Sequence, residues 1–202
     1  VAVAVHAAPR RVKSVALLND IDWRGGQFTT EGLAAVDEWT IYDGRRTYFP
    51  RSGLFFEIMA AIETNMQRRY GNPRPGNSFC AWTTCEPAQT EQIFRQFVAP
   101  YLAEHGGPLT IVPHYEAARV RVDAASVKGI EFVSTIEGRT RLTVSARLTI
   151  DASDWGDVIR LSRAGHMSGP DLKSDFHEPS APETYADVNG NEMNPLTYCL
   201  VL

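Results

Sequence analysis

The sequence lacks the features that would connect it to a membrane or to nucleic acid. No apolar run approaches the ~18 to 20 residues that a membrane-spanning helix needs. The 20 Lys and Arg do not outnumber the 24 Asp and Glu, which gives a net charge of −4. We therefore expect no membrane span and no nucleic acid partner. The composition, 44% hydrophobic and 22% charged in 202 residues, is typical of a soluble globular protein.

Cysteine is scarce, and Cys80, Cys85 and Cys199 form an odd set without a C-x-x-C pair. This spacing argues against a disulfide framework, and the five dispersed histidines do not complete a zinc pattern, so no metal site is predicted. Free cysteines usually pack as small buried hydrophobic side chains, which is the favoured interpretation here. A redox role for Cys85 is the alternative.

The sequence also has no G-x-G-x-x-G turn, the signature that places a dinucleotide pyrophosphate at a helix N-terminus. Residues 1–11 are first small and apolar and then basic, which is the reverse of the order in a secretion signal. Residues 2–11 are compatible with the last turns of a helix. Residues 198–202 are typical of a strand that enters a sheet. From these two ends we expect a fragment that begins after the glycine-rich turn, with a cytoplasmic location favoured over a secreted one.

The stretch from Ser14 to Gly32 is the most informative part of the sequence. Val15 to Leu18 form an unbroken apolar run, which predicts a strand buried on both faces of a parallel sheet. Polar residues follow at its carboxyl end, where open α/β sheets bind ligands. The Gly25-Gly26 pair then lets the backbone approach a ligand closely. The alternatives are a ligand-free tight turn at the glycines and a turn role for Asn19.

Periodicity predicts two amphipathic helices, one over residues 53–70 and one from Pro87 that is kinked or ended at Pro100. A short turn or helix is expected at residues 30–39, and irregular structure at residues 72–77. Residues 42–52 are expected to form a polar loop. Its arginines would either clamp an anionic substrate or lie in solvent; they are Arg45, Arg46 and Arg51.

Four extended runs follow, at residues 109–112, 117–122, 127–134 and 141–150, and the middle pair predict an antiparallel meander. The last run stops at Asp151 and turns through Gly156 toward a helix, which predicts a second strand end that faces a ligand. The alternative is that Asp157 caps that helix. Residues 168–194 are expected to form a loop or a mobile connection. Three histidines are possible general bases near neutral pH, but no pattern places them at a site; they are His114, His166 and His177.

Two motifs, in this order, carry a family resemblance. Residues 22–29 read D-W-R-G-G-Q-F-T with Asp37-Glu38 downstream, and residues 150–157 read I-D-A-S-D-W-G-D. They resemble the D-W-x-G-G-Q-x-T and I-D-A-T-E-L-G-D segments of bacterial FAD-dependent oxidoreductases in the glutathione-reductase-like flavoprotein superfamily. Further segments agree in order with this family, namely Pro75-Gly76-Asn77, Cys85-Glu86-Pro87, Ala99 to Leu102 and Tyr198-Cys199.

The resemblance implies an α/β protein with a Rossmann-like FAD/NAD(P)-binding fold, incomplete in this chain. A central parallel sheet with helices would carry an added antiparallel β-meander. Residues 1–40 and 105–165 would form the FAD-binding domain, and residues 41–104 a helical insertion on the substrate side. Residues 166–202 would form a loop and the start of a substrate domain.

The resemblance also implies contacts to FAD. Asn19 stands where the family usually ends its second strand with Glu, whose carboxylate binds the adenosine ribose, and an amide would bind with less charge assistance. Ala117 or Ala118 would lie on the strand that meets adenine. No residue is assigned a catalytic role. The implied cofactor-binding residues are Asn19, Asp20, Trp23, Gly25, Gly26, Gln27, Ala117, Asp151, Ala152, Ser153, Gly156 and Asp157.

The leading functional hypothesis is flavin-mediated hydride transfer on an unknown small-molecule substrate, with the oligomeric state left open. One alternative is a flavoprotein-like domain without bound cofactor that acts as a structural or partner-binding module, because Asn19 replaces an acid and the glycine-rich turn is missing. A second alternative is carbohydrate binding through tryptophans, although aromatic residues more often pack in a core. These tryptophans are Trp23, Trp39, Trp82 and Trp155.

Overall fold

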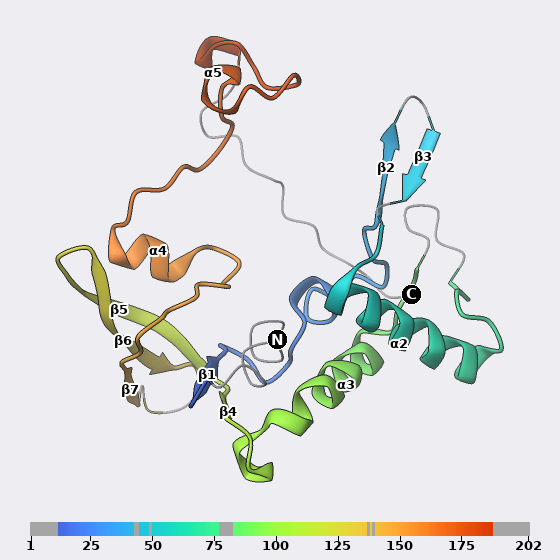
Figure 1. Ribbon diagram of the computed structural model, residues 1–202, viewed down its shortest axis with the longest axis horizontal. Helices are drawn as coiled ribbons and strands as arrows, with labels where there is room; N and C mark the ends of the chain where they lie inside the picture. The colour runs from blue at the N-terminus through green and yellow to red at the C-terminus, as the bar shows by residue number, and fades with distance from the viewer. Residues whose placement is uncertain are drawn as a thin grey trace. The chain divides into compact units, whose positions relative to one another are not determined.

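The structure is a computed structural model that describes residues 12–42, 45–48, 50–76, 83–136, 138 and 140–187, leaving aside the side chains of residues 39–48 (Figure 1). It divides into two compact units, Val1–Tyr115 with Cys199–Leu202 and Glu116–Tyr198, and each is described by itself. Several predictions fall outside the described residues, namely the helix at residues 2–11, the strand at residues 198–202, Cys80 and Cys199.

A pair of parallel strands lies in the first unit, as the sequence predicted. β1 (Val15–Leu18) pairs with β4 (Leu109–Val112) in a register that sets Val15 opposite Leu109. The predicted burial of β1 on both faces is wrong, because Ala16 is exposed and its neighbours are half-buried. Within the described residues β1 and β4 form a two-stranded sheet, whose packed side lies against Val98. The fold is therefore mixed helix and strand, with a small parallel sheet in this unit.

Two amphipathic helices form the main core of the first unit, and both confirm the periodicity in the sequence. α2 (Gly53–Tyr70) ends at Gly71, whose φ of 67° provides the left-handed cap that commonly ends a helix. α3 (Pro87–Val98) begins with proline at its first position, where the missing N–H costs no hydrogen bond. Their apolar faces pack into one cluster, which includes Leu54, Ile58, Met59, Ile62, Met66, Ile93 and Phe94.

The segment between β1 and α2 differs from what the sequence predicted. η2 (Gly26–Phe28) is a short 3-10 helix that inserts Phe28 edge-on against Phe55 and Phe94, with ring centroids at 6.4 and 5.7 Å. A turn follows at residues 29–31, which agrees with the turn alternative predicted for the start of residues 30–39, and residues 32–38 form no helix. β2 (Trp39–Tyr42) then pairs antiparallel with β3 (Arg45–Tyr48), so the predicted polar loop is wrong for residues 45–48. The β-branched residues of this hairpin favour strand pairing, and they are Thr40, Ile41 and Thr47.

The end of α3 confirms the predicted stop at Pro100. Two 3-10 turns follow it, η3 (Ala99–Tyr101) and η4 (Ala103–His105), and Gly106 closes the second with a φ of 80°. Leu109, the first residue of β4, is fully buried in a small cluster with Val98, the last residue of α3. This contact places the start of β4 beside the end of α3 (Figure 1).

The second unit contains the predicted antiparallel meander. β5 (Tyr115–Asp123), β6 (Ser126–Ser134) and β7 (Arg141–Val144) form a sheet in that order, and β6 pairs antiparallel with β7. The prediction that the last strand continues to Ile150 is wrong, because β7 ends at Val144. Leu148 and Ile150 are 75% and 52% exposed, so the chain that approaches Asp151 is not a described strand end.

Short helices follow the meander. α4 (Asp157–Ser162) confirms the predicted helix start after Gly156. α5 (Lys173–Phe176) and η5 (Tyr185–Asp187) are single turns within the stretch predicted as a loop. In the part of the chain that the structure describes, no helix combines the length and apolar character needed to cross a membrane.

Candidate functional site

The side chain of Asn19 closes the loop that leaves β1. Its amide nitrogen Nδ2 donates to the carbonyl oxygen of Ile21 at 3.0 Å and to that of Trp23 at 2.7 Å. The backbone N–H of Asn19 donates to Val112 and so extends the pairing of β1 with β4. These two side-chain hydrogen bonds favour the alternative of a turn role for Asn19. Among the described residues, no donor is hydrogen-bonded to its amide oxygen Oδ1.

Residues 22–27, the Asp22–Gln27 segment, contain two glycines with different surroundings. Gly25 has a φ of 118°, and a Cβ placed on it would lie 2.8 Å from Cε2 of Phe94. Gly25 is thus required by close packing on α3. Gly26 has a φ of 53°, and no atom of the described residues lies within 4 Å of its Cβ position. Gly26 and the exposed Gln27 form the open side of the segment.

Buried charges hold this segment on α3. Glu91, whose side chain is 2% exposed, accepts hydrogen bonds from Nη1 of Arg24 at 3.1 Å and from Nε of Arg95 at 2.6 Å. Arg95 also pairs with Oδ2 of Asp22 at 3.3 Å. The spacing of Glu91 and Arg95 is visible in the sequence as a helical i, i+4 pair. The contact to Arg24, 67 residues away, has no sequence signal.

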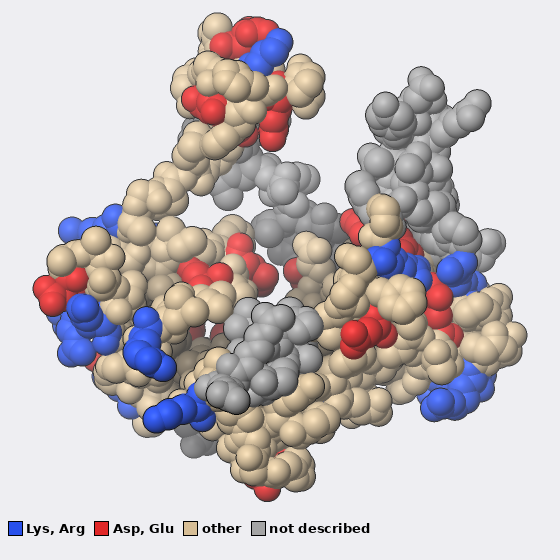
Figure 2. Space-filling model, in the orientation of Figure 1, with Lys and Arg blue, Asp and Glu red and all other residues tan. Residues whose placement is uncertain are grey.

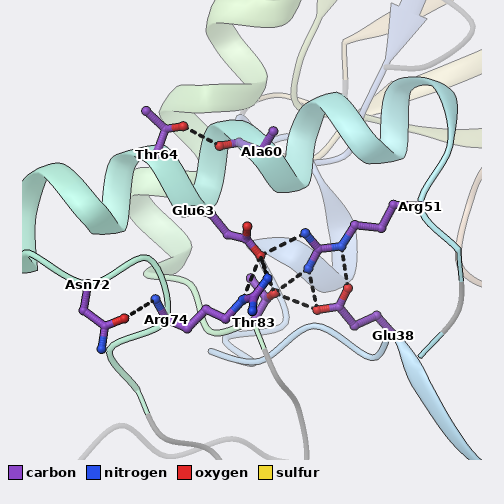
Figure 3. Close-up of polar contacts among 8 residues, drawn as sticks. All are labelled: Glu38, Arg51, Ala60, Glu63, Thr64, Asn72, Arg74 and Thr83. Atoms are coloured by element: carbon purple, nitrogen blue, oxygen red, sulfur yellow. Dashed lines mark hydrogen bonds and ion pairs between the residues drawn. The ribbon is translucent and has the colours of Figure 1, made fainter. Parts of the chain in front are cut away.

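A second network of buried charges surrounds Glu38 (Figure 3). Its carboxylate accepts from Nε and Nη2 of Arg51 at 2.7 and 2.8 Å. Nη1 of Arg51 and Nε of Arg74 both donate to Oε1 of Glu63, at 2.9 and 3.1 Å. The hydroxyl of Thr83 lies 2.6 Å from Oε1 of Glu38. Both interpretations of Arg51, as an anion clamp and as a solvated side chain, are wrong, because internal carboxylates occupy its guanidinium.

Replacing Glu38 with glutamine is expected to remove part of the acid sensitivity of folding. Desolvation opposes ionisation of this carboxyl, but hydrogen bonds from Arg51 and Thr83 outweigh it, and the pKa of Glu38 lies below its ordinary 4.5. A lowered pKa stabilises the folded state above pH 4.5, and this contribution is lost as the pH falls through the folded pKa. Glu38→Gln should therefore be less stable than the wild type at neutral pH, and the difference should shrink in acid.

Denaturant unfolding followed by circular dichroism at several pH values measures this difference in free energy. Glu57→Gln, at an exposed position of α2, is the control and should leave the pH dependence close to that of the wild type. A Glu38→Gln deficit that stays constant from neutral pH into acid would contradict the expectation.

In the second unit, residues 151–157 form a capping loop in front of α4. Oδ2 of Asp151 accepts the N–H of Ile159 at 2.9 Å, and Oδ1 accepts the N–H and hydroxyl of Ser153 at 3.1 and 2.7 Å. Burial opposes ionisation of Asp151, but these hydrogen bonds lower its pKa below the ordinary 3.8. Ser153 Oγ accepts the N–H of Asp157 at 2.8 Å. Asp151 and Ser153 therefore satisfy the first N–H groups of the helix.

The predicted alternative that Asp157 caps α4 is wrong. Asp157 is the first residue of the helix, and its Oδ1 pairs with Nη2 of Arg160 at 3.2 Å. The cap position itself belongs to Gly156, which has a φ of 64°. A residue before the helix, Asp151, supplies the carboxylate that a capping role requires.

Asp151→Ala is expected to destabilise α4 by about 1 kcal/mol, because the N–H of Ile159 loses its acceptor. The measurement is hydrogen exchange at the Ile159 amide, which should become faster. Asp154→Ala, two residues before the Gly156 cap and exposed, is the matched control. Equal exchange rates at Ile159 in the two variants would show that the carboxylate of Asp151 does not cap the helix.

The other candidate residues have local roles or exposed positions. Cys85 is 4% exposed in the core of the first unit, and burial raises the pKa of its thiol against the opposing effect of Thr90, which confirms the packing interpretation. Ala117 lies half-buried on β5. Trp23, in the first unit, is 39% exposed, and Trp155, in the second unit, is 69% exposed. Several candidate side chains lie outside the description, namely those of Trp39, Arg45, Arg46 and Trp82.

Among the described residues, the histidines and the surface charges do not form a further candidate metal or binding site. His166 Nδ1 lies 2.9 Å from the carbonyl oxygen of Ala164, His177 ends α5, and His114 turns the chain between β4 and β5 with a φ of 63°. No three His, Cys, Asp or Glu among the described residues are grouped so that they could hold a metal ion. On the face drawn in Figure 2, acidic and basic side chains are interspersed.

Comparison with known proteins identifies the family. A family model described as FAD dependent oxidoreductase matches residues 1–199. The chain belongs to the FAD-dependent oxidoreductase family. The predicted enzyme class and the predicted cofactor, FAD, are thereby confirmed. Comparisons with curated proteins and with solved structures gave no match.

The described residues fit the cofactor of the FAD-dependent oxidoreductase family to different degrees. Gly26 fits, because the space at its Cβ position is open and a ligand can approach the backbone. Gln27 fits as an exposed amide beside it. The carboxylate of Asp151 fits less well, because both of its oxygens already accept hydrogen bonds within the capping loop.

Proposed function

We propose that the Asp22–Gln27 segment contacts FAD through Gly26, Trp23 and Gln27. The observation that supports this most strongly is the open space over Gly26, next to a glycine that is fixed on α3. An exposed indole and an exposed amide on either side supply apolar and hydrogen-bonding surface for a ring and its polar atoms. When bound, the flavin supplies hydride transfer to or from a small-molecule substrate.

The roles of the neighbouring residues follow from their contacts. Asn19 holds the loop through Nδ2 and offers Oδ1 as an acceptor for a ribose hydroxyl, in the place where the family usually has Glu. Asp20 lies exposed beside it. Gly25 packs against Phe94 and so fixes how closely the segment approaches α3. It does not itself need to touch the ligand.

A second contact to FAD is proposed for the capping loop of α4, on the basis of its own geometry. Asp151 and Ser153 hold the loop, while Ala152 is exposed and Gly156 and Asp157 are half-buried at its surface. Ala117, on β5, is proposed to meet adenine through its backbone. The charged carboxylate of Asp151 already lies at the start of α4, so we assign the cofactor to the exposed backbone of this loop and not to the helix N-terminus.

The proposed architecture is a bacterial, glutathione-reductase-like protein with a Rossmann-like FAD-binding domain formed by residues 1–40 and 105–165. Residues 41–104 would form the substrate-side insertion, and residues 166–202 a loop and the start of a substrate domain. The parallel pairing of β1 with β4 supports a common domain for the parts of these two ranges that lie in the first unit, residues 1–40 and 105–115. The antiparallel meander supports the addition that follows β4.

Gly26→Asn tests the contact to FAD. Asparagine tolerates left-handed backbone, and none of the described residues would meet its Cβ, so the fold should be kept while the open side is filled. We expect the dissociation constant for FAD, measured by flavin fluorescence, to rise about tenfold or more, which corresponds to ~1.4 kcal/mol. Gly71→Asn, also at a left-handed glycine with open space but at the end of α2, is the matched control and should bind as the wild type.

Two results would contradict the proposal in different ways. Unchanged FAD affinity in Gly26→Asn would remove the Asp22–Gln27 segment from the binding site. A colourless wild-type protein that takes up no added FAD would favour the alternative of a flavoprotein-like domain that acts as a structural or partner-binding module.

A further inference from the structure

We infer that Glu91, on α3, is a positioning residue for the Asp22–Gln27 segment and thereby for FAD. This inference rests on the proposed contact between that segment and the cofactor. Glu91 does not face the open side of the segment. It acts through Arg24 and Arg95, whose guanidinium groups it joins.

The contacts around Glu91 form a closed ring. Oε1 of Glu91 accepts from Nη1 of Arg24, and the same Nη1 lies 3.4 Å from the carbonyl oxygen of Asp22. Oε2 of Glu91 accepts from Nε of Arg95, and Nη2 of Arg95 donates to both the carbonyl and the carboxylate of Asp22 at 3.3 Å. Glu91 is thus the shared acceptor that links Asp22 and Arg24 to one helix.

The same face of α3 fixes the next residue of the segment. Phe94, three positions after Glu91, lies where a Cβ on Gly25 would be 2.8 Å away. Residues three and four apart lie on one side of a helix, so Glu91, Phe94 and Arg95 all contact the segment from the same face of α3. These contacts end immediately before Gly26, the open residue. A rigid helix therefore sets the position of the backbone that is proposed to meet FAD.

The charge arrangement favours a positioning role over simple stabilisation. Buried ion pairs contribute little net stability, because desolvation offsets their attraction. Removing one partner is costly, however, because it leaves the other charge uncompensated. Nε of Arg24 is buried without an acceptor among the described residues, and the Arg24 side chain is only 12% exposed. Without Glu91 this guanidinium would leave its site and take the segment with it.

The test compares Glu91→Gln with Glu38→Gln. Glu38 is a matched control, because it is a similarly buried carboxylate in the same unit and is also bound by an arginine. Among the described residues, its hydrogen bonds go to Arg51 and Thr83 and not to the Asp22–Gln27 segment. The apoprotein melting temperature reports the structural cost of each change. The dissociation constant for FAD reports the positioning role. We expect Glu91→Gln to weaken FAD binding about tenfold or more, while Glu38→Gln, which shares no partner with the segment, stays within about twofold of the wild type.

A second variant covers the case in which Glu91→Gln fails to fold. Arg95→Met removes the link from Glu91 to Asp22 at a side chain that is 38% exposed, and it should weaken FAD binding in the same direction. The inference is overturned if Glu91→Gln or Arg95→Met binds FAD as the wild type does, or if Glu38→Gln weakens binding equally.

A readout without cofactor separates this inference from the proposed function. Hydrogen exchange at the Phe28 and Thr29 amides of the apoprotein, whose N–H groups donate to the carbonyl oxygens of Gly25 and Gly26, should be faster in Glu91→Gln than in Glu38→Gln, and equal rates overturn the role of Glu91. A wild-type protein that binds no FAD would instead contradict the proposed contact between the Asp22–Gln27 segment and FAD, whichever exchange rates are found. Normal FAD binding by Gly26→Asn would also count against that contact and not against the ring around Glu91.

Discussion

Replacing Gly25 with alanine is expected to lower the free energy of unfolding of the first unit by about 3 kcal/mol or more. Two costs combine at this position. The φ of 118° is strained for any residue with a Cβ, and the new Cβ would lie 2.8 Å from side-chain atoms of Phe94 and Thr29. Relief would require Phe94 to move, and Phe94 is a buried member of the α2–α3 cluster.

Gly26→Ala is the control that separates the two costs. Gly26 also has positive φ, but its Cβ position is open, so only the backbone strain of about 1 to 2 kcal/mol remains. Denaturant unfolding followed by circular dichroism, which reports α2 and α3, measures both variants. Equal losses of stability for Gly25→Ala and Gly26→Ala would mean that contact with Phe94 does not constrain Gly25.

Arg51→Met is the second change with a large expected effect, a loss of about 3 to 5 kcal/mol in the free energy of unfolding. The guanidinium of Arg51 makes two hydrogen bonds to Glu38 and one to Glu63. The hydrogen bond to Glu38 raises the pKa of Arg51, so the cation is held in its charged form. Methionine would preserve much of the side-chain volume but would leave the buried carboxylate of Glu38 without its cation.

Arg68→Met is the matched control, because it makes the same chemical change at an exposed position near the end of α2. Its unfolding midpoint should stay close to that of the wild type. The double variant Arg51→Met with Glu38→Gln should regain part of the lost stability, since no unpaired charge is then buried at Glu38. A small loss in Arg51→Met, similar to that in Arg68→Met, would show that the network around Glu38 opens to solvent at little cost.

The elements that local pattern determines were predictable from the sequence. The apolar stripe of α2 and the proline that opens α3 gave the positions of both helices, and the alternating β-branched runs indicated the meander. Each of these signals lies within a window of about 18 residues or fewer, the span over which periodicity is informative. The parallel strand at Val15–Leu18 was also identified, because an apolar run followed by polar residues is typical of such strands.

Contacts between distant residues were not predictable in this way. Arg51 was interpreted from its polar neighbours, but its partners Glu38 and Glu63 lie 13 and 12 residues away on separate elements. Arg24 and Glu91 are separated further still. Nothing in a single sequence distinguishes an arginine that finds a buried carboxylate from one that lies in solvent, because charge and side-chain length are the same in both cases.

The stretch before α4 shows how one pattern fits two structures. Apolar residues followed by Asp151 and small residues were interpreted as a strand end that faces a ligand, but β7 ends at Val144 and Asp151 caps the helix. Both arrangements place an acidic residue in front of a helix, one to bind a ligand and the other to accept backbone N–H groups. The exposure of Leu148 and Ile150 decides between them in this structure.

The network around Glu38 has a consequence for ionic strength. Two carboxylates, Glu38 and Glu63, face two guanidinium groups, Arg51 and Arg74, so the cluster is electrically neutral. Dissolved salt screens exposed charge pairs most and buried ones least. The exposed ion pair Lys173–Glu183 in the second unit should therefore weaken as salt is added. The buried ion pairs around Glu38 should keep most of their contribution to stability at high salt concentration.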